Sequence, residues 1–180
     1  MGLVGCQESN PKMNDPRFAP LTITPGEATS NYDGIEIQID SLNWLEGNQK
    51  SSLVVVWNNQ TQYEVTYGAS FAIERLDGED WVSCAIPEDP TFIAIGYLLP
   101  AGKMKNETYM LTDLFDVSSP GTYRFKTDCY VPDKAEQSTK CELIAEFTVG
   151  NTDDAGAGKV AGTEVEWAAQ YIRTNGGYEA

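Results

Sequence analysis

The strongest constraint on the fold is a series of short apolar segments with strand-like patterns, separated by Gly, Pro and Asn. Ile35, Ile37 and Ile39 alternate with polar neighbours, which is the period-2 pattern of a strand with one buried face. Residues 53–57 form a continuous, mostly β-branched run that ends at Asn58, as is typical of a strand through the middle of a sandwich. These segments predict β-strands.

Further strand signals follow at regular spacing. Asp77 and Gly78 lie between two β-prone segments, which predicts a hairpin joining strands around Ile73 and Val82. Other strands are expected at residues 91–95, 103–111, 121–129 and 141–149. Seven or eight short strands at this spacing predict an all-β chain folded as a two-sheet antiparallel β-sandwich.

The last two predicted strands can be aligned by the parity of their residues. Placing Cys129 opposite Cys141 aligns two apolar faces in a single antiparallel register. The aligned pairs are Thr127 with Leu143, Phe125 with Ala145, and Tyr123 with Phe147. We therefore predict a disulfide between Cys129 and Cys141, which an oxidising compartment would allow, and a free, mostly buried thiol at Cys84.

The two ends of the chain lack this pattern. Residues 3–6 read Leu-Val-Gly-Cys, which resembles a bacterial lipobox and makes Cys6 a candidate lipidation site, although so short a match also arises by chance. We expect residues 1–30 to be a truncated lipoprotein signal remnant with a flexible tether, and residues 31–150 to be the sandwich. Residues 151–180 are expected to form a linker and a short C-terminal helix.

That helix is predicted from a capping box at Thr163 and Glu166 and from the Gly176-Gly177 stop. Because the helix is too short to be stable alone, it either packs on the sandwich or begins a further domain.

Composition disfavours most enzymatic chemistry. The formal net charge is −15, and so acidic a protein repels phosphate backbones, which makes nucleic acid an improbable partner. The chain has no histidine, so it lacks the usual general base and the commonest metal ligand. None of the four cysteines forms a CxxC pair. We expect no enzymatic activity, no cofactor and no metal site.

A resemblance to a known family rests on several short motifs taken together. They are Leu53-Val54-Val55-Val56-Trp57-Asn58-Asn59, Tyr67-Gly68-Ala69-Ser70-Phe71-Ala72-Ile73-Glu74, Trp81, Leu99-Pro100-Ala101-Gly102, Gly121-Thr122-Tyr123-Arg124-Phe125 and Ala145-Glu146-Phe147-Thr148-Val149. In order and spacing these resemble bacterial immunoglobulin-like domains found in lipoproteins and membrane proteins of Gram-positive, mainly clostridial, bacteria. The resemblance implies an immunoglobulin-like sandwich in an extracellular, lipid-anchored setting, and it brings no catalytic residues.

Four aromatic residues are candidates for either a structural or a binding role. Tyr123 resembles a structural tyrosine corner, whose hydroxyl bonds back to the preceding loop. Trp57 and Trp81 could line a carbohydrate platform, but tryptophan in strand segments is more often part of the core. Trp44 is the better candidate for an exposed ring.

Two polar patterns are weak. Asp77, Glu79 and Asp80 could hold calcium, but they match no calcium loop, so a solvated turn is the simpler interpretation. Asn59 and Asn106 begin glycosylation-like triplets, which recur by chance.

The sequence leaves three functions open. The first is a non-catalytic surface module that recognises a protein or a glycan. The second is an immunoglobulin-like proteinase inhibitor, and the third is a spacer that presents a neighbouring domain.

Overall fold

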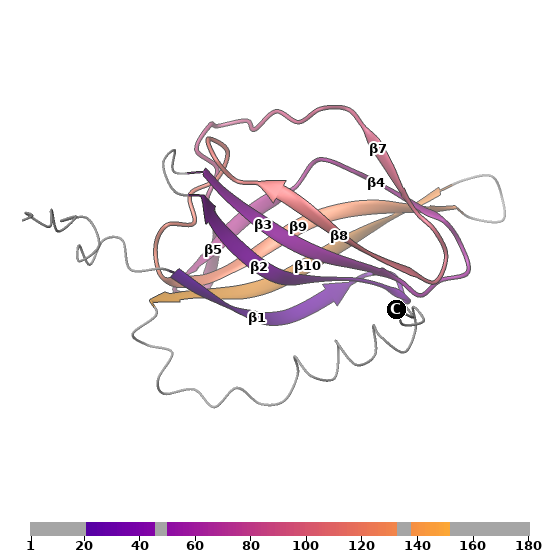
Figure 1. Cartoon of the computed structure of the whole chain (residues 1–180), viewed down its shortest axis with the longest axis horizontal. Helices are drawn as coiled ribbons and strands as arrows, with labels where there is room; N and C mark the ends of the chain where they lie inside the picture. Colours follow the sequence, from indigo (N-terminus) through magenta and orange to yellow (C-terminus); the bar gives the residue numbers. More distant parts are fainter. Residues whose placement is uncertain (1–20, 46–49, 133–137, 152–180) are drawn as a thin grey trace, which may run out of the picture.

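The computed structural model describes residues 21–45, 50–132 and 138–151, which form ten β-strands (Figure 1). The strands are β1 (Leu21–Ser30), β2 (Ile35–Leu45), β3 (Lys50–Asn59), β4 (Val65–Gly68), β5 (Ala72–Asp77), β6 (Asp80–Ser83), β7 (Gly96–Leu99), β8 (Lys103–Met110), β9 (Gly121–Pro132) and β10 (Ser138–Asn151). Among the described residues there is no helix, and so none that could cross a membrane.

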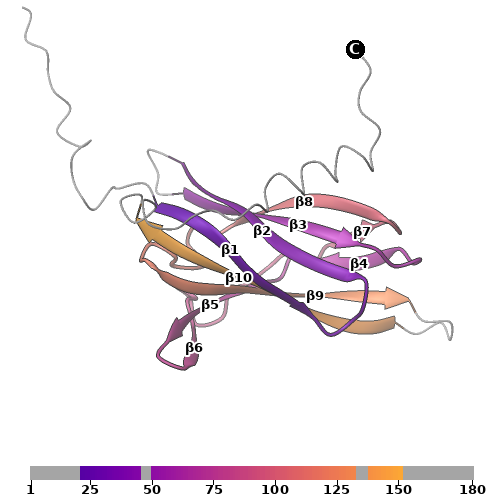
Figure 2. The same cartoon turned by 90° about the horizontal axis from the view of Figure 1, so that it is seen from below.

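The strands form two antiparallel sheets packed face to face (Figure 2). The larger sheet has the order β1-β10-β9-β4-β7, and the β5–β6 hairpin joins it through β9. The smaller sheet has the order β2-β3-β8. Strands β4 and β5 both pair with β9, β4 near Cys129 and β5 near Phe125. The predicted all-β sandwich is therefore confirmed.

The predicted register of the last two strands is confirmed in full. Cys129 lies opposite Cys141, and Tyr123 lies opposite Phe147. The inward-facing residues of β10, at alternate positions from Cys141 to Val149, are all buried. Parity determines this register, because a shift by one residue would turn the whole apolar set toward solvent.

The core fills the space between the sheets with aliphatic and aromatic side chains. Ile35, Ile37 and Ile39 of β2 are buried, as their alternation predicts. Trp57 is fully buried, as predicted, and stacks on Tyr67 with ring centroids 4.2 Å apart. Its indole N–H donates a hydrogen bond to the Tyr109 hydroxyl at 3.0 Å, so the polar atom of this large side chain is satisfied inside the core.

Two segments differ from the sequence-based expectation. Residues 21–30, expected to belong to a tether, form β1, which pairs with β10 and packs Ile23 against the core. Most residues of β1 are exposed, and its register shifts between Pro25 and Ala28. For these two reasons the sequence of β1 shows no clear alternation of apolar and polar residues. Residues 91–95, expected to be a strand, are not one, because pairing with the four-residue β4 begins only at Gly96.

Candidate functional site

An uncharged segment, residues 90–102, runs along one edge of the larger sheet and is called here the edge segment. It contains no Asp, Glu, Lys or Arg. Its strand β7 is the last in the sheet order and pairs only with β4. Three aliphatic side chains of this segment are exposed: Ile93 by 70%, Leu98 by 57% and Ile95 by 43%. An unpaired strand edge with exposed aliphatic groups is a template for pairing with another chain.

Two other sheet edges, those of β1 and β8, carry features that protect them from pairing. Strand β1, at the opposite edge of the larger sheet, contains Pro25 and a register shift. Strand β8, at the edge of the smaller sheet, carries Lys103 and Lys105. Proline, irregularity and lysine are the usual means by which sheet edges avoid unwanted pairing. Strand β7, which has four residues, contains no proline, register shift or lysine.

A polar and aromatic cluster supports β7 from the inside. Glu107 accepts a hydrogen bond from the Tyr67 hydroxyl and pairs with Lys105. The Lys105 ammonium lies 3.1 Å from the Tyr67 oxygen and 5.3 Å from the centroid of the Tyr97 ring on β7. Burial, together with Glu107, raises the pKa of Tyr67. The tyrosine therefore stays protonated, and the cluster joins β8 to the β4–β7 pair.

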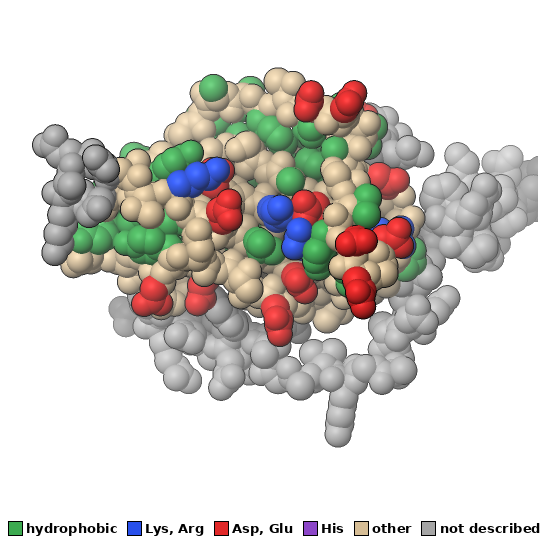
Figure 3. All heavy atoms as spheres, turned by 180° about the vertical axis from the view of Figure 1, so that it is seen from behind, with side chains coloured by type: hydrophobic (Ala, Val, Ile, Leu, Met, Phe, Trp, Pro, Cys, Tyr) green, Lys and Arg blue, Asp and Glu red, His purple; other side chains and the backbone are tan. Residues whose placement is uncertain are grey.

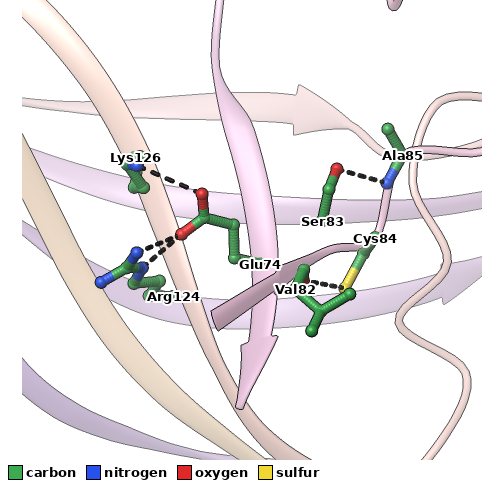
Figure 4. Close-up of polar contacts among 7 residues, drawn as sticks. All are labelled: Glu74, Val82, Ser83, Cys84, Ala85, Arg124 and Lys126. Atoms are coloured by element: carbon green, nitrogen blue, oxygen red, sulfur yellow. Dashed lines mark hydrogen bonds and ion pairs between the residues drawn. The ribbon is translucent and has the colours of Figure 1, made fainter. Parts of the chain in front are cut away.

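The outer face of the larger sheet carries a compact charged network of Glu74, Arg124 and Lys126 (Figure 4). Glu74 of β5 accepts hydrogen bonds from Arg124 and Lys126 of β9. The Arg124 guanidinium also lies 4.4 Å from the centroid of the Trp81 ring, in reach of a cation–π interaction. In the view of Figure 3, the few basic side chains each lie beside an acidic side chain. The charges of this network are largely satisfied within the sheet.

The prediction that Trp81 belongs to the core is wrong. Trp81 is only partly buried and lies opposite Leu76 in the β5–β6 hairpin. The turn end of this hairpin projects from the larger sheet (Figure 2), so Trp81 packs against Arg124 rather than in the core, whereas Ile73 near the start of β5 is buried between the sheets. The side chain of Trp44 lies outside the described residues. Asp77, Glu79 and Asp80 are exposed around the hairpin turn, and the described residues contain no group of three potential metal ligands.

A groove of about 500 Å³ lies between the β5–β6 hairpin and the chain leading into β9. Cys84 and Tyr123 are among its lining residues. The Tyr123 hydroxyl donates a 2.6 Å hydrogen bond to the Ser119 carbonyl, four residues earlier, which is the bond that a tyrosine corner requires. Cys84 is a free, half-buried thiol, and burial raises its pKa, which makes it a weak nucleophile at neutral pH.

The other two described cysteines are brought together. Cys129 and Cys141 lie directly opposite each other on β9 and β10 and are buried, but both are free thiols, so the predicted disulfide is not formed in this structure. Burial raises the pKa of Cys129 to about 12, and the adjacent Cys141 adds to this effect. Cys6 and the predicted C-terminal helix lie outside the described residues.

Sequence reasoning missed two features of this region. The first is the edge segment, although its thirteen uncharged residues are visible in the sequence. The second is Asn59, which is fully buried where a glycosylation acceptor would have to be exposed. No signal in the sequence distinguishes it from the neighbouring Asn58.

Two packed antiparallel sheets with Tyr123 bonded to its preceding loop define an immunoglobulin-like β-sandwich. The sequence matches the bacterial Ig-like domain family over residues 31–148, and the chain belongs to that family. Domains of this family are typically extracellular or surface-exposed and generally non-catalytic.

Other comparisons add little detail. No curated protein gives a significant match. Among solved structures, the chain is similar to the provisionally named ApaA protein of Bordetella pertussis, with 13% sequence identity and a TM-score of 0.35. That match covers 72% of this chain and 92% of the other.

Proposed function

We propose that this chain is a non-catalytic surface module that recognises a partner protein through the edge segment. The observation behind the proposal is the unprotected strand β7, which is flanked by exposed Ile93 and Ile95 and itself exposes Leu98. Soluble proteins normally guard such an edge, so leaving it open favours a role in binding.

The expected ligand is an extended, uncharged segment of a partner protein. Such a segment would add one strand beside β7, with main-chain hydrogen bonds providing affinity and aliphatic contacts to Leu98 providing selectivity. The charge distribution supports this choice. The chain has a net charge of −15, so an acidic peptide would be repelled, whereas the uncharged edge imposes no desolvation cost for charges on an apolar peptide.

A protein ligand is favoured over a glycan because of the aromatic residues. Carbohydrate recognition commonly uses an exposed, flat aromatic ring, yet Trp57 is buried and Arg124 lies over the ring of Trp81. The exposed groups of the edge segment are aliphatic instead, and aliphatic side chains suit contacts with another polypeptide.

We further propose that the domain is displayed on a cell surface by a lipid on Cys6, as in lipoproteins of Gram-positive bacteria. The lipobox-like residues 3–6 motivate this proposal. Radiolabelled fatty acid should enter the full-length protein and be lost from a Cys6→Ser variant. Failure of the wild-type protein to incorporate label would refute the anchor without affecting the binding proposal.

A phage-displayed library of random dodecapeptides tests the binding function. Selection on the immobilised full chain should enrich uncharged peptides rich in β-branched and aliphatic residues. A Leu98→Lys variant, which places a charge on the edge, should bind the selected peptides at least tenfold more weakly. The matched control is Val82→Lys, because Val82 is similarly exposed, by 50%, but lies on the β5–β6 hairpin.

Two outcomes would contradict the edge as the binding site. In the first, the selected peptides bind Leu98→Lys as tightly as they bind wild type. In the second, Val82→Lys weakens peptide binding as much as Leu98→Lys does. A panel of proteases, titrated with the chain, tests the alternative of a proteinase inhibitor. Stoichiometric inhibition that persists in Leu98→Lys would favour that alternative. If no peptide is enriched and no protease is inhibited, the spacer function is favoured and the binding proposal fails.

A further inference from the structure

The pair Cys129 and Cys141 has the backbone geometry of a disulfide site. Directly opposed residues in an antiparallel ladder have Cα atoms about 4.5–5.5 Å apart, which is within the range that a disulfide spans. Both side chains point to the same inner face of the larger sheet, and both are fully buried. Cys141 is also close enough to contribute to the raised pKa of Cys129. The backbone therefore already places the two cysteines at positions that a disulfide can join.

The folded protein protects these thiols from oxidation. A disulfide forms by attack of a thiolate, and an external oxidant must reach the attacking sulfur. Burial raises the pKa of both thiols, that of Cys129 to about 12. With neither thiolate formation nor solvent access favoured, oxidation in the folded state should be slow, although the geometry for the bond is present.

We propose that Cys129 and Cys141 form a cross-strand disulfide while the chain folds, and that the folded core then preserves whichever redox state was reached. The oxidant is a small disulfide such as glutathione disulfide. The Cys141 thiolate attacks one of its sulfur atoms, which forms a mixed disulfide and releases one glutathione thiolate. The Cys129 thiolate then attacks the Cys141 sulfur and releases the second glutathione. Two protein thiols are oxidised, the glutathione disulfide is reduced, and the leaving thiolates take up the two protons.

The position of the pair gives the bond a structural consequence. Strand β4 pairs with β9 at only two positions, Thr66 with Tyr130 and Tyr67 with Cys129. Strand β7 is attached to the sheet through β4. A disulfide at Cys129 would therefore hold the part of β9 to which the edge segment is anchored. This consequence bears on the proposed binding edge, but the disulfide itself does not depend on that function.

The test uses the full chain with Cys6→Ser, so that three thiols remain. One sample is refolded in a mixture of oxidised and reduced glutathione, and a second is refolded under reduction and then given glutathione disulfide. The first should show a peptide linking Cys129 to Cys141 by mass spectrometry and melt about 10 °C higher than the reduced protein. The second should react at Cys84 alone.

Two further variants separate the disulfide from a general effect of oxidation. Cys141→Val keeps an apolar side chain in the core and should melt at the same temperature under both conditions. Cys84→Ser should keep the full redox-dependent shift. Three free thiols after oxidative refolding, or Cys84 linked to either partner, would overturn the site. Oxidation of the buried pair as fast as of Cys84 in the folded protein would overturn its protection by the core.

Discussion

Asn59 shows how one buried polar side chain can fix several chain segments at once. Its amide nitrogen lies 2.8 Å from the carbonyl oxygen of Tyr63, 3.0 Å from that of Leu99 and 3.1 Å from that of Pro100. Its amide oxygen accepts hydrogen bonds from the backbone and hydroxyl of Thr61. A single residue thus connects the end of β3 to the turn after β7.

Replacing Asn59 by alanine should therefore be costly. The variant would leave the buried carbonyl of Leu99 without this donor, so we expect the free energy of unfolding to fall by about 3 kcal/mol. Urea denaturation followed by circular dichroism measures this loss. The control is Asn106→Ala, an exposed position on β8, where a change below about 0.5 kcal/mol is expected. Equal stability of the two variants would contradict the account of Asn59.

At the scale of elements, the turn between β7 and β8 transfers the chain from one sheet to the other. Gly102 has a φ of 65° in this turn, and a Cβ placed there would meet no atom within 4 Å. Any penalty for substitution therefore comes from the backbone rather than from a clash.

We expect Gly102→Ala to lower the free energy of unfolding by about 1 kcal/mol, because alanine disfavours the left-handed region. Gly150→Ala is a matched control, since a Cβ at Gly150 also meets no atom within 4 Å and its φ is not in that region. Thermal melting of the two variants compares them directly. A loss at Gly150 as large as that at Gly102 would show that the backbone conformation is not the cause.

The elements differ in how well the sequence predicts them. The pairing of β9 with β10 follows from parity, because both strands have an apolar face and a cysteine in matching positions. The β5–β6 hairpin follows from Asp77 and Gly78, and Gly78 adopts a positive φ of 65°. Strand β1 could not be predicted, because it derives its pairing from β10 and is mostly exposed. The residue at which β7 begins, Gly96, is determined by the length of its partner β4 rather than by the sequence of β7 itself.

The candidate site was harder to infer than the fold. Catalytic sites are recognised in a sequence by their polar and aromatic residues. The edge segment instead is defined by the absence of charged residues and by its position at the end of the sheet order. Residues 51–63 are also uncharged, but most of β3, which they include, is buried in the middle of the smaller sheet. Only the topology separates an uncharged core strand from an uncharged edge.

At the scale of the whole molecule, three buried tyrosines link stability to alkaline pH. Burial raises the pKa of Tyr67, Tyr109 and Tyr123 above the usual value of about 10. Above pH 10 the unfolded chain loses these protons while the folded chain keeps them, so the unfolded state binds fewer protons and stability falls as pH rises.

We expect the free energy of unfolding to fall between pH 10 and 12 by up to about 1.4 kcal/mol per pH unit for each tyrosine. Tyr109→Phe removes one titrating group, so its slope should be shallower, even though the loss of the bond from Trp57 lowers its stability at neutral pH. Urea titrations at several pH values measure both slopes. If the free energy of unfolding falls with pH equally steeply in wild type and in Tyr109→Phe, then Tyr109 does not contribute to the alkaline loss of stability.

We propose above that this immunoglobulin-like sandwich binds segments of a partner protein at the exposed edge of β7. Hydrogen–deuterium exchange of the full chain, with and without a peptide selected from the dodecapeptide library, tests it most directly. We expect slowed exchange at those backbone amides of Gly96–Leu99 that point away from β4, where β7 has no partner strand, with little change in the β5–β6 hairpin. Protection confined to that hairpin or to the outer face around Arg124, with β7 unchanged, would contradict it.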